Sequence, residues 1–83
     1  MYNKENTPVK TQFVVGKQYL DTREEVVVTI TGRTACTVSF TFEDKETGWH
    51  GEVKRAGLKV SFNGDEYTAG GLVLCYSNSV YNG

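Results

Sequence analysis

Apolar and hydroxyl-bearing residues alternate along residues 25–42, and this is the strongest pattern in the chain. In the first arm of this stretch the apolar positions are Val26, Val28 and Ile30. In the second arm they are Cys36, Val38, Phe40 and Phe42. Side chains in a β-strand point alternately to its two faces, so the pattern predicts two strands, each with an apolar inner face and a hydroxyl-rich outer face. We expect these strands to form a hairpin that turns at residues 32–34.

Shorter runs of alternation predict the remaining strands. They cover residues 13–19, 49–54, 58–62, 65–69 and 72–76. Charged or glycine-containing segments separate them, at residues 20–24, 43–48, 55–57 and 70–71. Asn63-Gly64 predicts a type I′ turn, in which both central residues need a positive φ. Gly51 falls on the inner face of its strand, where it leaves room for a large neighbour such as a phenylalanine of the preceding strand.

About six short strands at close spacing, without a convincing helix, predict an all-β fold. We expect a small SH3-like barrel of five to six antiparallel strands, because a barrel closes the edges that a small flat sheet would leave open. An OB-like barrel is the alternative, although such folds usually carry a helix. The barrel should occupy residues 12–77, after a flexible lead-in at residues 1–11 and before a polar tail at residues 78–83.

Length and charge narrow the classes of function. The 83 residues suffice for one modest core, but not for a second domain or a large cofactor cleft. The 9 basic and 10 acidic residues give a net charge of −1, so there is no overall field that would attract nucleic acid or an anionic membrane. Because no apolar run reaches transmembrane length and the N-terminus lacks the apolar segment of a signal peptide, we expect a cytoplasmic protein.

The chemically reactive side chains do not form a catalytic or metal-binding motif. The single histidine, His50, is expected on the outer face of a strand, whereas Cys36 is expected in the core, so the two would not face each other. One histidine and two separated cysteines do not make a structural zinc set. We expect Cys36 and Cys75 to be buried thiols, with a disulfide between them as the alternative. The sequence therefore predicts a non-enzymatic protein without a cofactor or a metal.

Basic residues are the better candidates for a binding site. Arg33 falls in the central turn, and Lys54, Arg55 and Lys59 surround the break between two later strands. Basic groups contact phosphates, and aromatic side chains nearby could stack on bases. The alternative is a scatter of solubilising charges among nearly equal numbers of acids.

Three further residues are candidates for a binding surface. Val27 is an apolar side chain on the hydroxyl-rich face of its strand. Trp49 begins a strand after a glycine turn, a position that suits either the end of a barrel core or an anchor for a partner. His50 follows it on the outer face.

Four spaced segments carry a resemblance to a known family. They are Phe13-x-Val15-Gly16-Lys17-x-Tyr19, Arg33-Thr34-Ala35-x-Thr37-Val38, Val53-Lys54-Arg55 and Gly64-x-Glu66-Tyr67. This pattern resembles small uncharacterised bacterial proteins of phages, plasmids and other mobile elements, and it covers residues 13–76. Near the C-terminus, Cys75-Tyr76-Ser77-Asn78-Ser79 replaces a Tyr-Ser-Met-Ala-Pro-like ending of that family. The resemblance implies a mobile-element origin and an accessory or host-interaction role, but no established activity.

The sequence thus predicts a non-enzymatic binding module whose partner is a protein, bound through a barrel face or an exposed edge strand. Inhibition of a host defence nuclease is one concrete form of this role. A small nucleic-acid-binding barrel that uses the basic residues is the alternative. A homodimer joined through an open edge strand is a further alternative, and we expect no membrane partner.

Overall fold

The alternating stretch forms a long hairpin in the computed structural model, which describes residues 9–69 and 73–82. Its two strands are β2 (Val26–Arg33) and β3 (Thr37–Asp44), which pair in antiparallel fashion. The alternate apolar residues predicted to face inward are buried, except for Cys36. The turn between the strands occupies residues 34–36, two residues later than predicted.

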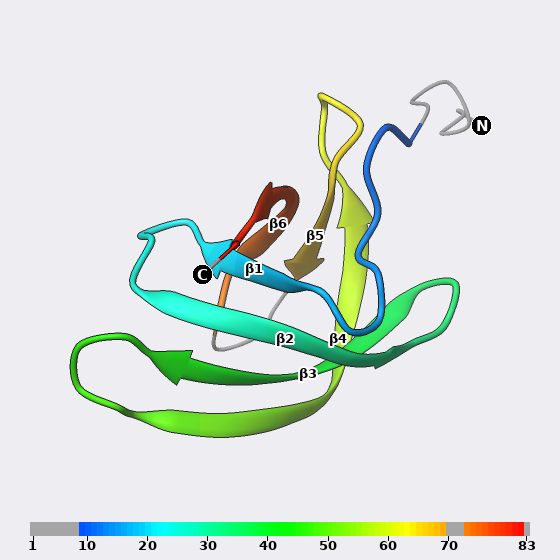
Figure 1. Cartoon of the computed structure of the whole chain (residues 1–83). Coiled ribbons are helices and arrows are strands. Elements are labelled where there is room, and N and C mark those ends of the chain that lie inside the picture. The colour runs from blue at the N-terminus through cyan, green and yellow to red at the C-terminus, as the bar shows by residue number, and fades with distance from the viewer. Residues whose placement is uncertain (1–8, 70–72, 83) are drawn as a thin grey trace.

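Four more strands close the barrel, with each strand antiparallel to its neighbours (Figure 1). They are β1 (Gln18–Asp21), β4 (His50–Val60), β5 (Glu66–Ala69) and β6 (Cys75–Val80). The strand order follows the chain from β1 to β6, and β6 returns to pair with β1. The prediction of an all-β barrel of five to six antiparallel strands is confirmed, and the architecture is consistent with a small SH3-like barrel.

The break predicted at residues 55–57 is instead a bend inside one continuous strand, β4. Opposite Ser39 of β3, β4 has two residues, Lys54 and Arg55, where a regular ladder has one. β2 has an extra residue, Thr31, at the same level on the other side of Ser39. Such β-bulges bend a strand and increase its twist, so the two bulges together curl the long strands into the barrel wall (Figure 1).

The core combines side chains from five strands with two residues outside them. Its buried members are Phe13, Tyr19, Val26, Val28, Ile30, Val38, Phe40, Phe42, Ala56, Val73 and Cys75. Phe13 was expected in a strand but precedes β1, where its ring packs edge-on against Tyr19 with the centroids 4.9 Å apart. The sixth strand, β5, differs because its inward-facing residues are polar. Glu66 and Thr68 are both buried.

The turn between β4 and β5 differs from the predicted type I′ turn. Gly64 has φ +92°, but Asn63 does not have the positive φ that a type I′ turn requires. The N–H of Gly64 donates to the carbonyl of Ser61 at 2.9 Å, so residues 61–64 form a turn that ends in a left-handed glycine. This longer loop places Gly64 where an L-residue would be strained, and it is a common alternative to the two-residue hairpin.

The two cysteines occupy different environments, and the predicted burial of Cys36 is wrong. Cys36 is exposed because it precedes the first residue of β3 and belongs to the turn, where Thr34 Oγ1 accepts the backbone N–H groups of Cys36 and Thr37. Cys75 is buried, and both thiols are free, so the alternative of a disulfide is also wrong. Burial, and secondarily the charge of Asp21, raises the pKa of the Cys75 thiol to about 12.

The ends of the barrel extend beyond the predicted domain. β6 continues to Val80, so residues 78–80, which were expected in the polar tail, are strand residues. The N–H groups of Lys10 and Thr11, which were expected in the flexible lead-in, donate to the carbonyl of Gly64 at 2.6 and 3.3 Å. The rest of the lead-in (residues 1–8), the glycine break at residues 70–71 and the last residue lie outside the described residues.

Gly51 has the predicted role of making room for a phenylalanine. A Cβ at this position would lie 2.8 Å from Cζ of Phe42. Phe42 is buried, so its ring has little freedom to move away. We therefore expect Gly51→Ala to lower the free energy of unfolding by about 1–3 kcal/mol, measured by urea denaturation.

Gly57→Ala is the matched control for this change. It lies on the same strand, and its added Cβ would lie 3.8 Å from the nearest atom, the carbonyl oxygen of Ala69. We expect it to leave the free energy of unfolding almost unchanged. Equal destabilisation by the two substitutions would show that the contact with Phe42 is not the cause.

The raised pKa of Cys75 predicts a loss of stability at alkaline pH. The folded protein keeps this proton up to about pH 12, whereas the unfolded chain releases it near the ordinary thiol pKa of 9.0. Between these values the unfolded state binds fewer protons, so the free energy of unfolding falls as the pH rises. Urea denaturation across this range should show a smaller fall for Cys75→Ala than for the wild type. The remaining fall is expected to come from Tyr19, whose pKa burial also raises.

Cys36→Ala serves as the control, since the Cys36 side chain is exposed. It should show the same alkaline dependence as the wild-type protein. If the free energy of unfolding of Cys75→Ala fell as steeply with pH as that of the wild type, Cys75 would not be a source of the alkaline loss of stability.

Candidate functional site

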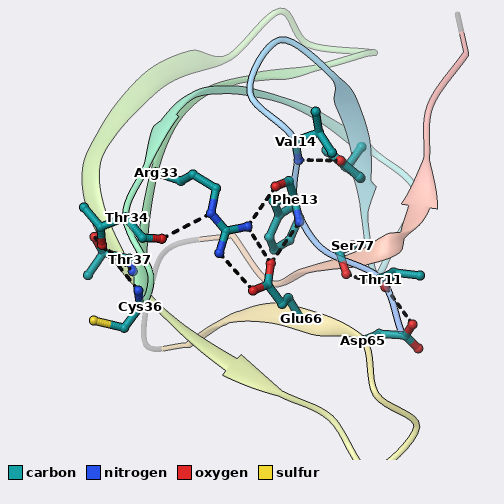
Figure 2. A network of polar contacts seen from close by, with 11 residues as sticks. Thr11, Phe13, Val14, Arg33, Thr34, Cys36, Thr37, Asp65, Glu66 and Ser77 are labelled. Carbon is teal, nitrogen blue, oxygen red and sulfur yellow. Dashed lines mark hydrogen bonds and ion pairs between the residues drawn. The ribbon is translucent and has the colours of Figure 1, made fainter. Parts of the chain in front are cut away.

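Arg33, the first residue of the predicted basic site, is engaged in a partly buried ion pair (Figure 2). Its Nη1 and Nη2 atoms donate to Oε1 and Oε2 of Glu66 at 2.8 and 3.0 Å. Nη1 also donates to the carbonyl of Phe13 at 2.8 Å. The side chain of Arg33 is 20% exposed and that of Glu66 is 6% exposed. The guanidinium is therefore a structural group, not a free contact for phosphate.

The same ion pair joins segments that are distant in the sequence. The Oε1 atom of Glu66 accepts the backbone N–H of Phe13 at 2.9 Å, so one carboxylate binds both the guanidinium and the segment before β1. The hydrogen bond to Glu66 raises the pKa of Arg33. Beside this cluster, Thr11 Oγ1 donates to Asp65 at 2.7 Å and lies 2.6 Å from the hydroxyl of Ser77 (Figure 2). Together these contacts fix the N-terminal segment across β5 and β6.

The other predicted basic residues lie on the outside of β4. Lys54 and Arg55 are exposed neighbours at the bulge, and Lys59 is exposed four residues further along the strand. At about 3.3 Å per strand residue, Lys59 lies roughly 13 Å from Arg55 along the chain. None of the three forms an ion pair with any residue in 9–69 or 73–82. The structure thus brings together Lys54 and Arg55, but not the whole predicted set.

Val27 and His50 line a shared depression of about 560 Å³ on the outer face of β1 to β4. Val27 is half-buried there, and His50 is exposed with its Nδ1 atom 2.9 Å from the carbonyl oxygen of Gly48. Trp49 is 51% exposed and packs on Phe42, with the ring centroids 4.8 Å apart. Trp49 therefore covers one end of the core while half of its surface remains exposed, and its role as an anchor for a partner stays a prediction.

A second groove, of about 590 Å³, was not predicted from the sequence. It lies between the β1–β2 turn and the β4–β5 turn, over the outer faces of β1, β5 and β6. We call it the aromatic groove and define it by Leu20, Glu24, Phe62, Tyr67, Tyr76 and Asn78. Its residues come from segments up to 58 positions apart, counted from Leu20 to Asn78, so only closure of the barrel assembles them.

The floor of the aromatic groove is a stacked pair of tyrosines. Tyr67 of β5 and Tyr76 of β6 are register partners, and their ring centroids lie 5.0 Å apart at an interplanar angle of 27°. Phe62, at the tip of the β4–β5 turn, is 98% exposed. The sequence predicted Phe62 as the last residue of a strand over residues 58–62, which is wrong because β4 ends at Val60 and the chain turns before Phe62. Large exposed aromatic side chains grouped in this way mark interaction sites.

The ionisable side chains described in the wall of the aromatic groove are all acidic: Asp21, Glu24 and Asp65. Asp21 is buried, and its Oδ1 atom accepts the backbone N–H groups of Glu25 and Val26 at 2.9 and 3.1 Å. Asp65 accepts the hydroxyl of Thr11 and is also buried. Glu24 is the exposed member of this set and is free to contact a ligand.

Glu24 also has an unusual backbone conformation, since it is the one non-glycine residue among those described with a positive φ, +61°. Its N–H donates to the carbonyl of Asp21 at 3.0 Å, which makes it the last residue of a turn, as Gly64 is in the β4–β5 turn. A left-handed conformation costs an L-residue about 1–2 kcal/mol relative to the right-handed region. A glycine at this position would avoid this cost.

The residues described as lining the two grooves include one histidine, His50, and no cysteine. Within residues 9–69 and 73–82, no three histidine, cysteine, aspartate or glutamate side chains are grouped so that they could hold a metal ion. The same part of the chain has no helix long and apolar enough to cross a membrane. The exposed Cys36 belongs to the β2–β3 turn and is not among the residues that line either groove.

The Arg33–Glu66 pair should make a large contribution that depends on both partners. Arg33→Met leaves a buried carboxylate without its cation, so we expect the free energy of unfolding to fall by about 3–5 kcal/mol. In the double variant with Glu66→Leu the uncompensated charge is absent, so its loss should be smaller than the sum of the two single losses. A double-mutant cycle in urea measures this coupling.

Arg55→Met is the matched control, because Arg55 is exposed and has no ion pair with the described residues. We expect its stability to stay within about 0.5 kcal/mol of the wild type. Additive single losses at Arg33 and Glu66 would show that the two side chains do not act as a pair.

Comparison with known proteins assigns this chain no relative. No protein-family model, no curated protein and no solved structure matches it.

Proposed function

We propose that this protein is a non-enzymatic binding module that recognises a protein partner through the aromatic groove. The observation that carries the proposal is the exposure of Phe62, 98%, beside the stacked pair of Tyr67 and Tyr76. Burial of aromatic side chains supplies much of the free energy of protein–protein binding, and such residues are the usual hot spots. A groove of about 590 Å³ is the size that accommodates a short peptide segment or a few side chains.

The placement of the reactive side chains supports a non-enzymatic role. His50, Cys36 and Cys75 lie on the outer face of β4, in the β2–β3 turn and in the core, respectively. General acid–base and nucleophilic catalysis both need such groups within hydrogen-bonding reach of one another. The raised pKa of Cys75 also keeps its thiol protonated, and therefore weakly nucleophilic, at neutral pH.

The resemblance to proteins of mobile elements suggests where such a partner would be found. It would make the module an accessory or host-interaction protein in the cytoplasm of a bacterial cell. An inhibitor of a host defence nuclease is the concrete form that we propose to examine first.

A nucleic acid is the second candidate partner. Lys54 and Arg55 support it, because the bulge presents both exposed cations side by side on β4. The engagement of Arg33 with Glu66 removes one of the four cations that the sequence suggested. Phosphate contacts by Lys54 and Arg55 would make binding strongly dependent on salt concentration.

Selection from a display library of short random peptides tests the proposal. We expect the immobilised protein to enrich peptides whose binding is weakened about tenfold by Phe62→Ser, since loss of a hot-spot aromatic costs about 1–2 kcal/mol. Val15→Ser removes an apolar side chain that is also exposed, 53%, but does not line the aromatic groove, and it should leave binding unchanged.

The double variant Lys54→Glu/Arg55→Glu separates the two candidate partners. It should bind the selected peptides as well as the wild type does. Two results together would contradict the protein-binding role and favour the nucleic-acid role. The selection would enrich no peptides, and the wild type would show salt-sensitive binding of DNA or RNA that the double variant lacks.

A further inference from the structure

We infer that the aromatic groove recognises a basic segment of the partner, presenting arginine or lysine side chains, an inference that rests on the proposed protein-binding function. The groove combines an aromatic floor with an acidic wall. Each of these two features favours a cation, for a different physical reason.

The charge of the groove is one-sided although that of the chain is not. The whole sequence has nearly equal numbers of basic and acidic residues, 9 and 10. The ionisable side chains described in the groove wall are three carboxylates, Asp21, Glu24 and Asp65, and no lysine or arginine accompanies them there. Arg23 is in the same turn as Glu24 but does not line the groove. Its Nε atom lies 3.5 Å from Oδ2 of Asp21 and 3.8 Å from Oε1 of Glu25. A concave surface of one sign attracts groups of the opposite sign and repels nucleic acid.

The aromatic floor suits the same kind of ligand. The stacked pair of Tyr67 and Tyr76 forms one broad π surface, and both side chains are only half-buried. A guanidinium or ammonium group within about 6 Å of such a ring is attracted by its quadrupole. An arginine side chain can lie flat on a tyrosine while its outer N–H groups reach a carboxylate. The groove offers both contacts, with the tyrosines below and Glu24 at the rim.

Glu24 is the residue that should make the direct ionic contact. Asp21 and Asp65 are buried, and their carboxylates already accept hydrogen bonds from the protein. Glu24 is exposed, and no described ion pair or side-chain hydrogen bond uses it. Its left-handed backbone conformation, φ +61°, would suit glycine better, as the equivalent Gly64 illustrates. A role in binding explains why a strained position carries a long acidic side chain.

The shape of the groove favours an extended segment over a folded surface. Two turns of similar form, residues 21–24 and residues 61–64, flank it, and Phe62 projects from the second one. The space between them, about 590 Å³, holds a few side chains. An extended segment could place an apolar side chain against Phe62 and a basic one between Tyr67 and Glu24.

The test uses the peptides selected on the wild-type protein. We expect arginine and lysine to be enriched in them relative to aspartate and glutamate. A synthetic version in which citrulline, a neutral isostere, replaces each arginine should bind about fivefold to tenfold more weakly. Glu24→Gln, which keeps the size and backbone of the residue, should weaken binding of the arginine peptide to a similar degree, and added salt should reduce the difference between the two proteins.

Two variants separate recognition from folding. Glu46→Gln removes an exposed carboxylate in the β3–β4 turn that does not line the groove, and its affinity for the arginine peptide should equal that of the wild type. Glu24→Gly should unfold at no lower urea concentration than the wild type and yet lose affinity, because it removes backbone strain together with the carboxylate.

The outcomes distinguish this inference from the function on which it rests. Enriched peptides that depend on Phe62 but are neutral or acidic would leave the binding function standing and overturn the inference. The same holds if citrulline peptides bind as tightly as arginine peptides. A dimer in light scattering that Phe62→Ser dissociates would make a second copy of the chain the occupant, and would overturn both proposals.

Discussion

The partly buried ion pair between Arg33 and Glu66 joins parts of the barrel that backbone pairing between strands does not connect. Arg33 ends β2 and Glu66 begins β5, and these strands are not neighbours in the sheet. The same carboxylate also binds the N–H of Phe13, so the segment before β1 is held across the barrel as well. A bidentate guanidinium–carboxylate pair fixes orientation as well as distance. The position of β5, and with it the aromatic groove, depends on this polar cluster.

Curvature and closure complement this cluster. The bulges on either side of Ser39 bend the long strands, and Gly51 admits the ring of Phe42 where a larger residue would push it away. The ladder between β5 and β6 is much thinner, with one pair of register partners among the described residues, Tyr67 and Tyr76. The stacking of these two rings therefore reinforces the join where backbone pairing is sparse.

The strand content was predictable from the sequence because the alternation of side chains directly reflects which face is buried. The errors have physical causes. A break was expected at residues 55–57 because the two outward cations Lys54 and Arg55 interrupt the alternation of side chains. In the structure a β-bulge accommodates the one extra residue without ending the strand. Cys36 matches the alternation of the buried residues of β3, but it lies in the turn before that strand and is exposed. Arg33 looked like a free cation because its partner, Glu66, is 33 residues away and is itself buried.

The aromatic groove could not be predicted for a related reason. Its floor comes from β5 and β6 and its rim residue Glu24 from the β1–β2 turn, and only the pairing of β6 with β1 brings them together. This position has a mechanical consequence. The barrel is closed, but among the described residues its strand pairing is uneven, dense from β2 to β4 and sparse between β5 and β6. A ligand lying on Tyr67 and Tyr76 would contact both β5 and β6 across this sparse pairing. Occupancy would then stiffen the barrel as a whole, and slow hydrogen exchange in β5 and β6 would accompany the bound state.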